Sequence, residues 1–598
     1  MKLIATLFLS TLLSFAYSQY TIQSQYLQNP DLLIPYVEDC ADFWIGAHDD
    51  LYGGFYVDIN RYGNVTNDSY KMIVNQSRDA YGLTRAYMLT GNENYLNMAQ
   101  SAIDFMQNYL YDTEYGGWYS QCNRDGSSPS LGDKTAFDQH YALLGLTAYF
   151  EATTNGTAMQ YIDNSFDFMN TYMWDNRPDY LGYYDVVSRN GSNPSGKTFN
   201  STADAVTTHL YNLYLLTENQ KYLDRLMVMK ANLQDHFVGS MSQQVIGFAE
   251  AYDSDWNIDP SEERTIMGHV LKTAWCLART HTVQSDQTAI NDAEFLVEDV
   301  WNNGYDHEYG GPYKDYNRLT GEMYMYGAND IAKAWWQMEQ AVTSGLLLFD
   351  ITRGGRYLKM ADESLDFFME YFVDDTYNEV YADRSRTGGR VYFDGGYWDE
   401  NKGSGWKAGY HSIETGYYAY LYGKLLLNDE PVTLYYKYES ADTARTIFMN
   451  PLATDFTQLE VTAVTKDGNS YTDFDGTNRT LNLPAGTSGT FAITYKYNNA
   501  GSVDIEEIAQ NTIPFQMMGA YPNPFNNQTQ INLKILRPEE IEFSLYNTNG
   551  QLIDTKILFE NQGEIQISID GENLPEGLYI YKITASGYQY AGKILKNN

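Results

Sequence analysis

Six residues that can move protons or hold charge recur along the chain at nearly equal intervals. They are Arg78, His140, His209, His269, Glu339 and His411, with gaps of 62, 69, 60, 70 and 72 residues. Four of the eight histidines therefore fall at equivalent places in a repeat. Histidine has an unperturbed pKa of ~6.5, so it can both take and return a proton near neutral pH. The pattern predicts acid–base chemistry at a site assembled from several repeats.

A second repeat marks the turns that must position these residues. A turn element with glycine and aromatic residues begins at Gly53, Gly116, Gly182, Gly247 and Gly310, with a degraded sixth copy at Asn378. The gaps between copies are 63, 66, 65, 63 and 68 residues, and each gap holds two helix-length amphipathic stretches. Six such units predict a closed (α/α)6 barrel over residues 31–428. Barrels of this kind usually act on sugars, and residues near the starts of the inner helices converge at one mouth.

The residue types suit proton transfer at the carbon next to a sugar aldehyde. That reaction needs a base that is neutral near pH 7 and an acid that returns the proton. His269 and His411 lie on the fourth and sixth inner helices, which are not adjacent, so the two rings can flank a sugar. Arg78 can stabilise the negative charge of an enediolate intermediate. No HExxH or clustered carboxylate–histidine spacing is present, so we expect neither a metal nor another cofactor.

The stretches around these residues resemble the N-acylglucosamine 2-epimerase superfamily, which also includes cellobiose 2-epimerases and mannose isomerases. The resemblance spans the whole barrel. It is carried by Asn75-Gln-Ser-Arg78, Thr208-His-Leu210, Gly268-His-Val-Leu-Lys-Thr-Ala-Trp275, Lys333-Ala-Trp-Trp-Gln-Met-Glu339 and Trp406-Lys-Ala-Gly-Tyr-His411.

The resemblance implies roles for particular residues. It implies that Arg78, His269 and His411 form the catalytic core. The substrate-binding residues expected beside them are Trp335, Trp336, Glu339, His209, Lys272 and Trp406. Lys272 stands where the family usually has a glutamate, three residues after the histidine of the fourth helix. The expected function is a sugar 2-epimerase or an aldose–ketose isomerase.

After residue 430 the hydrophobic period changes from helical to alternating. Residues 431–498 predict a small β-sandwich, 499–517 a linker, and 518–598 a second all-β module. The last module resembles the type A sorting domain of the type IX secretion system. The matching segments are Tyr521-Pro-Asn-Pro-Phe525, Leu545-Tyr-Asn547, Asn549-Gly550, Leu574-Pro-Glu-Gly-Leu-Tyr579 and Lys593-Ile-Leu-Lys596. This resemblance implies export by the type IX machinery to the cell surface or the medium. The predicted architecture is an all-α (α/α)6 barrel (residues 19–430) followed by two small all-β sandwich-like domains.

Both the N-terminus and the overall charge fit an exported protein. Residues 1–18 have the positive start, apolar run and small residues of a signal peptide, and no later run is long enough to span a membrane. The formal net charge is −38, which argues against nucleic acid and anionic membranes as partners. Cys40, Cys122 and Cys276 lack the spacing of metal ligands and predict buried thiols.

Two alternative functions remain open from the sequence. One is an inverting glycoside hydrolase, which would use a pair of carboxylates on the same barrel. Its candidate residues are Asp138, Glu250, Asp253 and Asp255. The other is a non-catalytic carbohydrate-binding surface protein. A shared fold cannot separate these functions from an epimerase.

Overall fold

The computed structural model describes most of the chain. The described residues are 20–323, 332–393, 396–397, 401–452, 454–498, 515–535, 539–548, 550–560, 563–585 and 588–597. The predicted signal peptide lies outside them, as do Asn549 of the sorting motif and most of the predicted linker.

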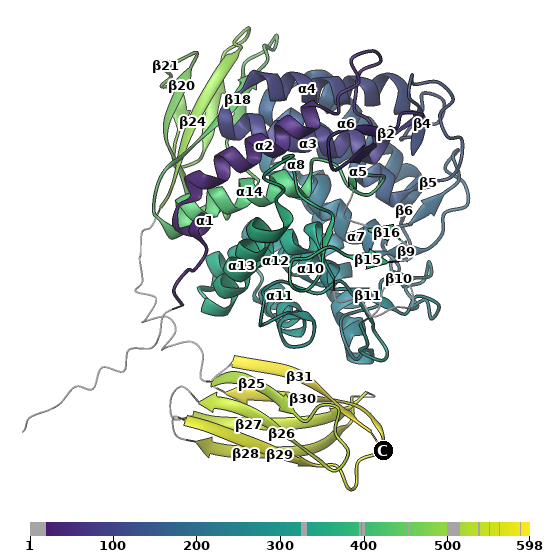
Figure 1. Ribbon diagram of the computed structural model, residues 1–598, viewed down its shortest axis with the longest axis vertical. Coiled ribbons are helices and arrows are strands. Elements are labelled where there is room, and N and C mark those ends of the chain that lie inside the picture. Colours follow the sequence, from purple (N-terminus) through teal and green to yellow (C-terminus); the bar gives the residue numbers. More distant parts are fainter. Residues whose placement is uncertain are drawn as a thin grey trace, which may run out of the picture.

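Twelve helices in the described part of the chain form two concentric rings (Figure 1). After the short α1 (Gln25–Gln28) and η1 (Pro30–Leu32), the outer ring consists of α2 (Leu33–Ile45), α4 (Glu93–Phe105), α6 (Gly156–Phe168), α9 (Gln220–Asn232), α11 (Gln287–Asp299) and α13 (Gly355–Phe367). The last five continue into π-helical turns at Met106–Leu110, Met169–Met173, Leu233–Val238, Val300–Gly304 and Phe368–Phe372. The inner ring consists of α3 (Ile73–Thr90), α5 (Ala136–Thr153), α7 (Phe199–Ala205) with η4 (Val206–Leu210) and α8 (Tyr211–Thr217), α10 (Met267–Val283), α12 (Trp335–Thr352) and α14 (His411–Tyr422) with η10 (Gly423–Leu427).

The ring is closed, because α14 packs against both α2 and α3. Inner helices are covered on one side by outer helices and on the other by the barrel interior, so α3 is buried at every position from Ile73 to Leu89. Outer helices bury only one face, as α4 does through Tyr95, Leu96, Ala99 and Ala102. The predicted (α/α)6 barrel is confirmed.

Short strand pairs surround the mouth of the barrel, at the starts of the inner helices. In each pair the strand before an inner helix bonds to a strand in a neighbouring loop. The pairs are β3 (Tyr70–Met72) with β4 (Gln121–Asn123), β5 (Lys134–Thr135) with β8 (Val186–Val187), β9 (Lys197–Thr198) with β10 (Ala251–Tyr252), β11 (Arg264–Ile266) with β12 (Asp315–Asn317), β13 (Lys333–Ala334) with β14 (Asp383–Arg384), and β17 (Asn401–Gly403) with β1 (Asp58–Asn60). The last pair joins the end of the barrel to its first loop. Smaller elements here are β2 (Val65–Asn67), β6 (Trp174–Asp175), β7 (Gly182–Tyr183), η6 (Met241–Gln243), β15 (Tyr392–Phe393) and β16 (Gly396–Tyr397).

Buried ion pairs hold the loops of five of the six repeats. In the first, Lys71 donates to Asp49 at 2.9 Å and to the carbonyl of Gly53 in the turn. An arginine, Arg124, donates to both oxygens of the same aspartate. The equivalent lysine–aspartate pairs are Lys134–Asp112, Lys197–Asp175, Lys333–Asp306 and Lys402–Asp374. The degraded sixth turn also forms, because Asn378 and Glu379 both adopt the left-handed conformation of the glycines that they replace.

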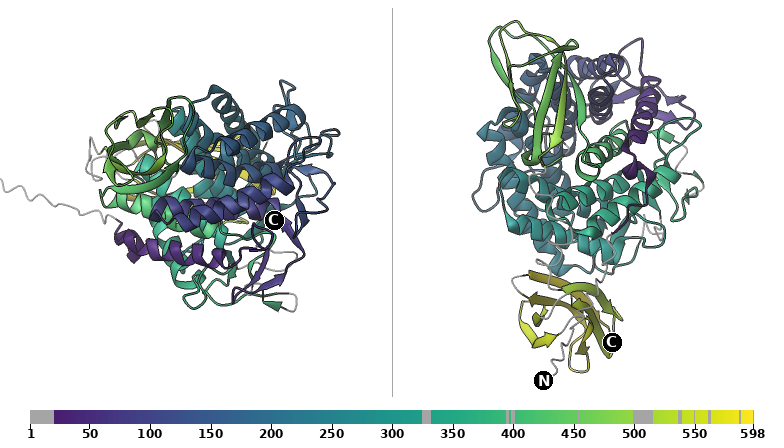
Figure 2. Two further views of the ribbon diagram at one scale, coloured as in Figure 1. Left: turned by 90° about the horizontal axis from the view of Figure 1, so that it is seen from above. Right: turned by 90° about the vertical axis from the view of Figure 1, so that its left-hand side faces the viewer.

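The first β module covers the opposite end of the barrel. Its two sheets have the orders β18-β24-β20-β21 and β19-β23-β22 (Figures 1 and 2). The elements are β18 (Val432–Tyr438), β19 (Arg445–Phe448), η11 (Phe456–Gln458), β20 (Leu459–Lys466), β21 (Asn469–Ser470), β22 (Phe474–Asp475), β23 (Thr480–Leu483) and β24 (Gly489–Tyr497). Tyr497 donates to Asp350 at 2.6 Å, and Asn450 donates to the carbonyl of Leu215. Both acceptors lie near the C-terminal ends of inner helices, and one hydrophobic core runs through barrel and module.

The C-terminal module is a sandwich with a core of its own (Figure 1). Its sheets have the orders β25-β26-β29 and β28-β27-β30-β31. The strands are β25 (Phe515–Tyr521), β26 (Gln528–Ile535), β27 (Glu539–Asn547), β28 (Leu552–Glu560), β29 (Gly563–Asp570), β30 (Gly577–Ala585) and β31 (Tyr588–Lys596). Within the described ranges, no helix is both long and apolar enough to cross a bilayer.

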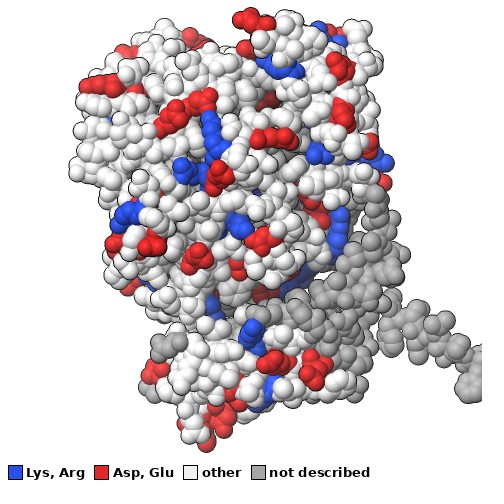
Figure 3. Space-filling view, turned by 180° about the vertical axis from the view of Figure 1, so that it is seen from behind, with Lys and Arg blue, Asp and Glu red and all other residues white. Residues whose placement is uncertain are grey.

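The surface and the cysteines agree with the composition. On the face shown in Figure 3, acidic and basic side chains are interspersed rather than gathered by sign. Cys40, Cys122 and Cys276 are all described, all buried and all free of disulfide bonds.

Candidate active site

A cavity of about 560 Å³ lies where the inner helices begin. Its volume falls in the range of small-molecule sites. Seven of the nine predicted site residues line it: Arg78, His269, Lys272, Trp335, Trp336, Trp406 and His411. They come from α3, α10, α12, α14 and the loop before α14, so the repeat brings together residues that are more than 300 positions apart.

His269 is the third residue of α10 and is held from two sides. Its Nδ1 lies 2.8 Å from Oε2 of Glu250, and its ring stacks on Phe199 at a centroid distance of 3.8 Å. The other oxygen of Glu250 accepts from the backbone N–H of Ile266, at the entry to the helix. A carboxylate at Nδ1 favours the tautomer with the proton on that nitrogen, which leaves Nε2 as the acceptor. The arrangement fixes the ring so that Nε2 can exchange a proton with a ligand in the cavity.

Gly268 allows this close packing. A Cβ atom at this position would lie 2.6 Å from Cγ of Gln337 and 2.7 Å from Cζ3 of Trp336. The backbone N–H of Gly268 donates to Oε1 of Gln337 at 3.0 Å. The start of α10 therefore lies directly against the start of α12, which carries the paired tryptophans.

His411 has a similar arrangement in a more buried place. Its Nδ1 lies 3.2 Å from Oε2 of Glu339, and only 5% of the residue is exposed. Burial lowers the pKa of His411 well below its usual value, and the charges of Arg78, Lys272 and Lys407 lower it further. Burial, with the nearby charge of Glu414, raises the pKa of Glu339 well above its usual range.

Trp336 lies between the two histidines. Its ring centroid is 5.3 Å from that of His269 and 6.2 Å from that of His411. Trp335 lies 6.3 Å from His411, and Trp406 is 73% exposed at the rim. The aromatic faces line a space that both histidines border.

Arg78 is a buried cation with an unusual set of neighbours. It is 6% exposed, and its Nη1 donates to the backbone carbonyl of Trp406 at 2.6 Å. Its guanidinium lies over the ring of Tyr141 at 4.4 Å. Among the described residues, no carboxylate lies within ion-pair distance of it, and its Nε has no hydrogen-bond partner. A buried guanidinium without a counter-ion is suited to a ligand that develops negative charge.

Lys272 pairs with Asp204 in the same cavity. The Nζ–Oδ1 distance is 2.6 Å, and both side chains are almost fully buried. Burial opposes the charge on Lys272, but the attraction of Asp204 outweighs it and raises the pKa of Lys272 above its usual value. Asp204 was not among the residues predicted from the sequence, nor was Glu250 predicted as the partner of His269.

Two predicted residues lie outside the cavity lining. Glu339 contacts the site only through His411. His209 is fully buried and stacks on His140 at 5.4 Å. His209 is the eleventh residue of the third inner helix, counted from Phe199, whereas Asp204, which lines the cavity, is the sixth. A role for His209 in sugar binding stays a prediction without geometric support.

The carboxylates proposed for a hydrolase do not converge. Asp253 and Asp255 lie at the surface and bind Asn257 and Arg177. Asp138 binds Thr135 and is not part of the cavity lining. Glu250 forms a hydrogen bond with Nδ1 of His269.

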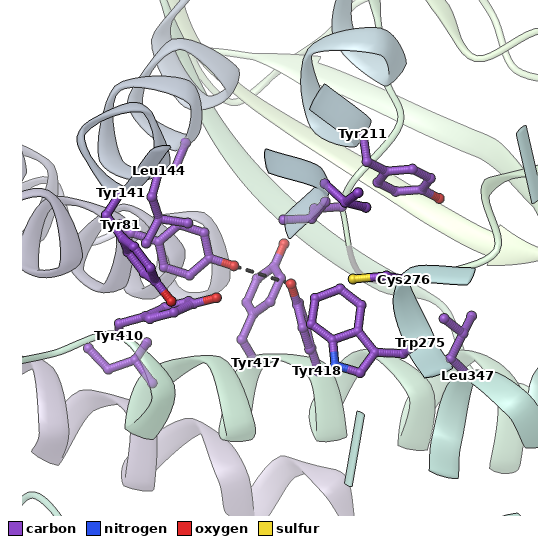
Figure 4. Packing of buried hydrophobic residues seen from close by; sticks show 14 of the residues in the cluster. Tyr81, Tyr141, Leu144, Tyr211, Trp275, Cys276, Leu347, Tyr410, Tyr417 and Tyr418 are labelled. Atoms are coloured by element: carbon purple, nitrogen blue, oxygen red, sulfur yellow. Dashed lines mark hydrogen bonds between the residues drawn. The ribbon is translucent and has the colours of Figure 1, made fainter. Parts of the chain in front are cut away.

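Within the described residues, one buried group has the ligand types and spacing of a cation site. Ligand atoms of Glu339, His411 and Glu414 lie within 4.8 Å of one another. Both glutamates of this group already accept hydrogen bonds, since Tyr81 donates to Oε1 of Glu414 and Thr343 donates to Glu339. Figure 4 shows Tyr81, Tyr410 and Tyr418 gathered in the barrel interior, where Tyr81 and Tyr418 approach to 3.2 Å. The surroundings are those of a hydrogen-bonded polar network.

Comparisons with known proteins identify the families that two parts of the chain match. The sequence model of the N-acylglucosamine 2-epimerase (GlcNAc 2-epimerase) family matches residues 54–392, and that of the secretion system C-terminal sorting domain matches residues 519–597. The cellobiose 2-epimerase of Ruminococcus albus is 23% identical over 355 residues, which cover 57% of this chain and 88% of the relative. The cellobiose 2-epimerase of Bacteroides fragilis is 23% identical over 375 residues, covering 60% and 90%.

Solved structures share the fold of the barrel. A D-mannose isomerase aligns with a TM-score of 0.58 and 20% identity over 67% of this chain and all of its own. The cellobiose 2-epimerase of Spirochaeta thermophila aligns with a TM-score of 0.56 and 21% identity, covering 67% of this chain and 98% of its own. The family match covers more than half of the chain. The chain therefore belongs to the N-acylglucosamine 2-epimerase family and ends in a secretion system C-terminal sorting domain.

Proposed function

We propose that this protein is an exported carbohydrate isomerase that acts by moving the C2 proton of an aldose. One observation carries the proposal. Two histidines, each with a carboxylate at Nδ1, border the same cavity from non-adjacent helices, with Trp336 between them. Relatives named as cellobiose 2-epimerases and a D-mannose isomerase support this reaction class.

The mechanism follows from where the groups stand. Nε2 of one histidine removes the proton from C2, and the C–H electron pair forms the C1–C2 double bond of an enediolate. The negative charge that develops on the oxygen at C1 is stabilised by Arg78, which lacks an acidic partner in the described structure. The other histidine must carry a proton on Nε2 when the sugar binds, and it returns that proton. Return to the opposite face of C2 gives the epimer, and return to C1, with transfer of the hydroxyl proton from O2 to O1, gives the ketose.

The cavity suits a mono- or oligosaccharide. Trp335 and Trp336 offer aromatic faces to the reacting unit, and the exposed ring of Trp406 at the rim can stack against a second unit. The epimer and the ketose form from the same enediolate and differ in whether C2 or C1 takes up the proton, so both stay within the proposal.

Export is the second part of the proposal. The C-terminal sorting domain supports delivery by the type IX machinery to the cell surface or medium, after entry through the predicted signal peptide. Mass spectrometry of secreted native protein should find an N-terminus at or near Gln19 and no peptides beyond about residue 518. Secreted protein with intact C-terminal peptides contradicts removal of the sorting domain.

The test of the reaction is isotope exchange. Purified protein is incubated with aldoses and β-linked disaccharides in D2O, and deuterium at C2 is followed by NMR. We expect exchange without bond cleavage, and loss of exchange by about 10²- to 10⁴-fold in His269→Asn and in His411→Asn. His281→Asn is the matched control, because His281 lies on α10 outside the cavity and binds only the loop at Asp286.

Each outcome separates the candidate functions. Cleaved oligosaccharide means a hydrolase, and binding without exchange or cleavage means a sugar-binding protein. Parental exchange in the His269→Asn/His411→Asn double variant contradicts the mechanism even if the reaction class is right.

A further inference from the structure

We propose that Lys272, held in place by Asp204, donates a hydrogen bond to a sugar oxygen at the inner end of the cavity and thereby determines which sugars are accepted. The inference deepens the proposed function and rests on it. Nothing in the comparisons assigns a role to this pair.

Four residues that line the cavity lie at the same level of the barrel. Arg78, Tyr141, Asp204 and Lys272 are each the sixth residue of an inner helix, namely of α3, α5, α7 and α10. All four line the cavity. His269 is the third residue of α10, so Lys272 lies about one helical turn further from the mouth. The side-chain exposure agrees, since 17% of His269 but only 4% of Lys272 is exposed.

Contacts join these four side chains into a continuous wall. The guanidinium of Arg78 covers the Tyr141 ring at 4.4 Å, the Tyr141 hydroxyl lies 3.5 Å from Nζ of Lys272, and Nζ lies 2.6 Å from Oδ1 of Asp204. A sugar that reaches both histidines therefore meets this wall at its far end. The wall carries one fixed ammonium group beside the aromatic faces.

The ammonium group has capacity left for a ligand. Lysine has three N–H donors and no acceptor. Asp204 takes one donor at 2.6 Å, and the tyrosine contact at 3.5 Å is at the outer limit of a hydrogen bond. Because the pKa of Lys272 is raised, the group stays charged and cannot serve as a base. The free donors can be satisfied by a hydroxyl oxygen of the sugar.

Burial makes such a contact selective. A buried polar group that loses its ligand partner is left unsatisfied, so a site built to bind a hydroxyl rejects the analogue that lacks it. Asp204 contributes by position: it fixes Nζ and neutralises its charge, which leaves the site suited to an uncharged sugar. A carboxylate can only accept a hydrogen bond from a sugar, whereas an ammonium group can only donate one. A lysine at this place therefore recognises a sugar oxygen as an acceptor.

The experiment compares deoxy sugars in two proteins. The best aldose from the isotope-exchange screen and its 3-, 4- and 6-deoxy analogues are measured with the parent chain and with Lys272→Met/Asp204→Asn, which removes both charges together. We expect one analogue to lose about 10- to 100-fold in kcat/KM in the parent, the usual effect of one charged hydrogen bond. The same analogue should lose about two-fold or less in the double variant. Equal losses in both proteins for every analogue overturn the proposal.

Two further measurements keep the result decisive. Lys272→Gln retains a donor and should keep part of the discrimination if the double variant folds poorly. Glu151→Gln is the matched control. Glu151 forms a buried ion pair with Arg85, with 2.8 Å between Oε2 and Nη2, and neither residue lines the cavity. It should lower thermal stability without changing the ratio between deoxy analogues.

A binding measurement separates this proposal from the proposed function. If no aldose exchanges its C2 proton, calorimetry with the corresponding sugar alcohols still tests the contact. Binding that is about 10-fold or more weaker in the double variant supports the Lys272 site although the isomerase proposal has failed. Equal affinities of the two proteins, or no binding by either, overturn the proposed role of Lys272.

Discussion

Each histidine in the cavity meets a carboxylate through Nδ1, but the two carboxylates have different surroundings. Glu250 also accepts from the backbone of Ile266, whereas Glu339 accepts from Thr343 and lies near Glu414. The first pair is the more exposed, with 17% of the His269 side chain accessible, against 6% for His411. The two rings are therefore chemically distinct, which suits an enzyme that removes a proton at one place and returns it at another.

Glu250 should act as a positioning residue for His269. In Glu250→Gln the side chain can present an N–H to Nδ1, which favours the tautomer with the proton on Nε2 and removes the acceptor from the sugar side. We expect kcat for C2 exchange to fall about 10- to 100-fold with little change in KM, together with a shifted acid limb of the pH profile. The control is Glu263→Gln, whose side chain binds Asn317 away from the cavity. A large rise in KM at unchanged kcat contradicts this role.

Arg78 should contribute mainly to the transition state. In Arg78→Ala the enediolate loses a charged donor, and removal of one such donor in other enzymes costs roughly 3 kcal/mol, or about 100-fold in kcat. Binding of a sugar alcohol, measured by calorimetry, should change much less because no oxyanion forms. Arg78→Lys should recover part of the rate, since an ammonium group keeps the charge but not the planar contact with Tyr141. Equal losses of binding and turnover contradict the assignment.

At the scale of elements, the contact between the starts of α10 and α12 sets the distance from His269 to the tryptophans. Gly268→Ala places a methyl group where Gln337 and Trp336 now lie. Either the Trp336 ring or the helix start must move by several tenths of an ångström. We expect kcat/KM to fall about 10-fold or more, because small displacements of catalytic groups are costly. Gly355→Ala is the control, since no atom lies within 4 Å of the added Cβ at that position. Unchanged kinetics in Gly268→Ala would contradict this role of the contact, because the Trp336 ring could then move without loss of activity.

The elements also explain what the sequence could and could not predict. Helical periodicity and the turn repeat predicted the rings, and the starts of the inner helices brought Arg78, His269 and His411 together. The prediction placed His209 by its distance along the chain, but His209 is the eleventh residue of its inner helix, whereas the cavity-lining Asp204 is the sixth. The pairing of Glu250 with His269 could not be predicted, because Glu250 lies in a hairpin 19 residues before His269 and only the folded loop brings them together.

Two patterns in the sequence correspond to contacts that the spacing of the histidines does not predict. A lysine follows an aspartate by 22 residues in the first three repeats, at Asp49, Asp112 and Asp175, and each pair is buried and bonded. The sixth residue of four inner helices supplies Arg78, Tyr141, Asp204 and Lys272. Counting from the helix starts, rather than between histidines, would have identified this wall.

At the scale of the whole molecule, the mouth and the opposite end of the barrel are built differently. The mouth carries the strand pairs and the cavity, and the other end is covered by β18–β24 with a shared hydrophobic core (Figure 2). Residues 431–498 therefore belong structurally with the barrel and complete its core. The last sandwich has a core of its own, in keeping with its separate match to a secretion system C-terminal sorting domain.

Asp350 contacts Tyr497 where the barrel meets the first β module. The burial of Asp350 should make the stability of the folded protein depend on pH. Burial raises the pKa of Asp350 from 3.8 to about 7. The folded state therefore binds the proton more tightly than the unfolded state. The folded form is favoured fully below pH ~4, and this contribution is lost as the pH rises to about 7. The difference corresponds to about 4 kcal/mol between these limits.

Asp350→Asn should remove this dependence while keeping an acceptor for the Tyr497 hydroxyl, which now lies 2.6 Å from Oδ2. We expect the variant and the parent to unfold at similar denaturant concentrations near pH 4. At pH 8 the variant should be the more stable, by up to about 4 kcal/mol. The measurement is chemical denaturation across this pH range, with the difference between the two proteins isolating Asp350 from other titrating groups. Tyr497→Phe is the companion variant, because loss of the donor leaves the carboxylate less satisfied and should steepen the pH dependence. A constant difference between parent and Asp350→Asn at all pH values would mean that Asp350 stays ionised where barrel and module meet.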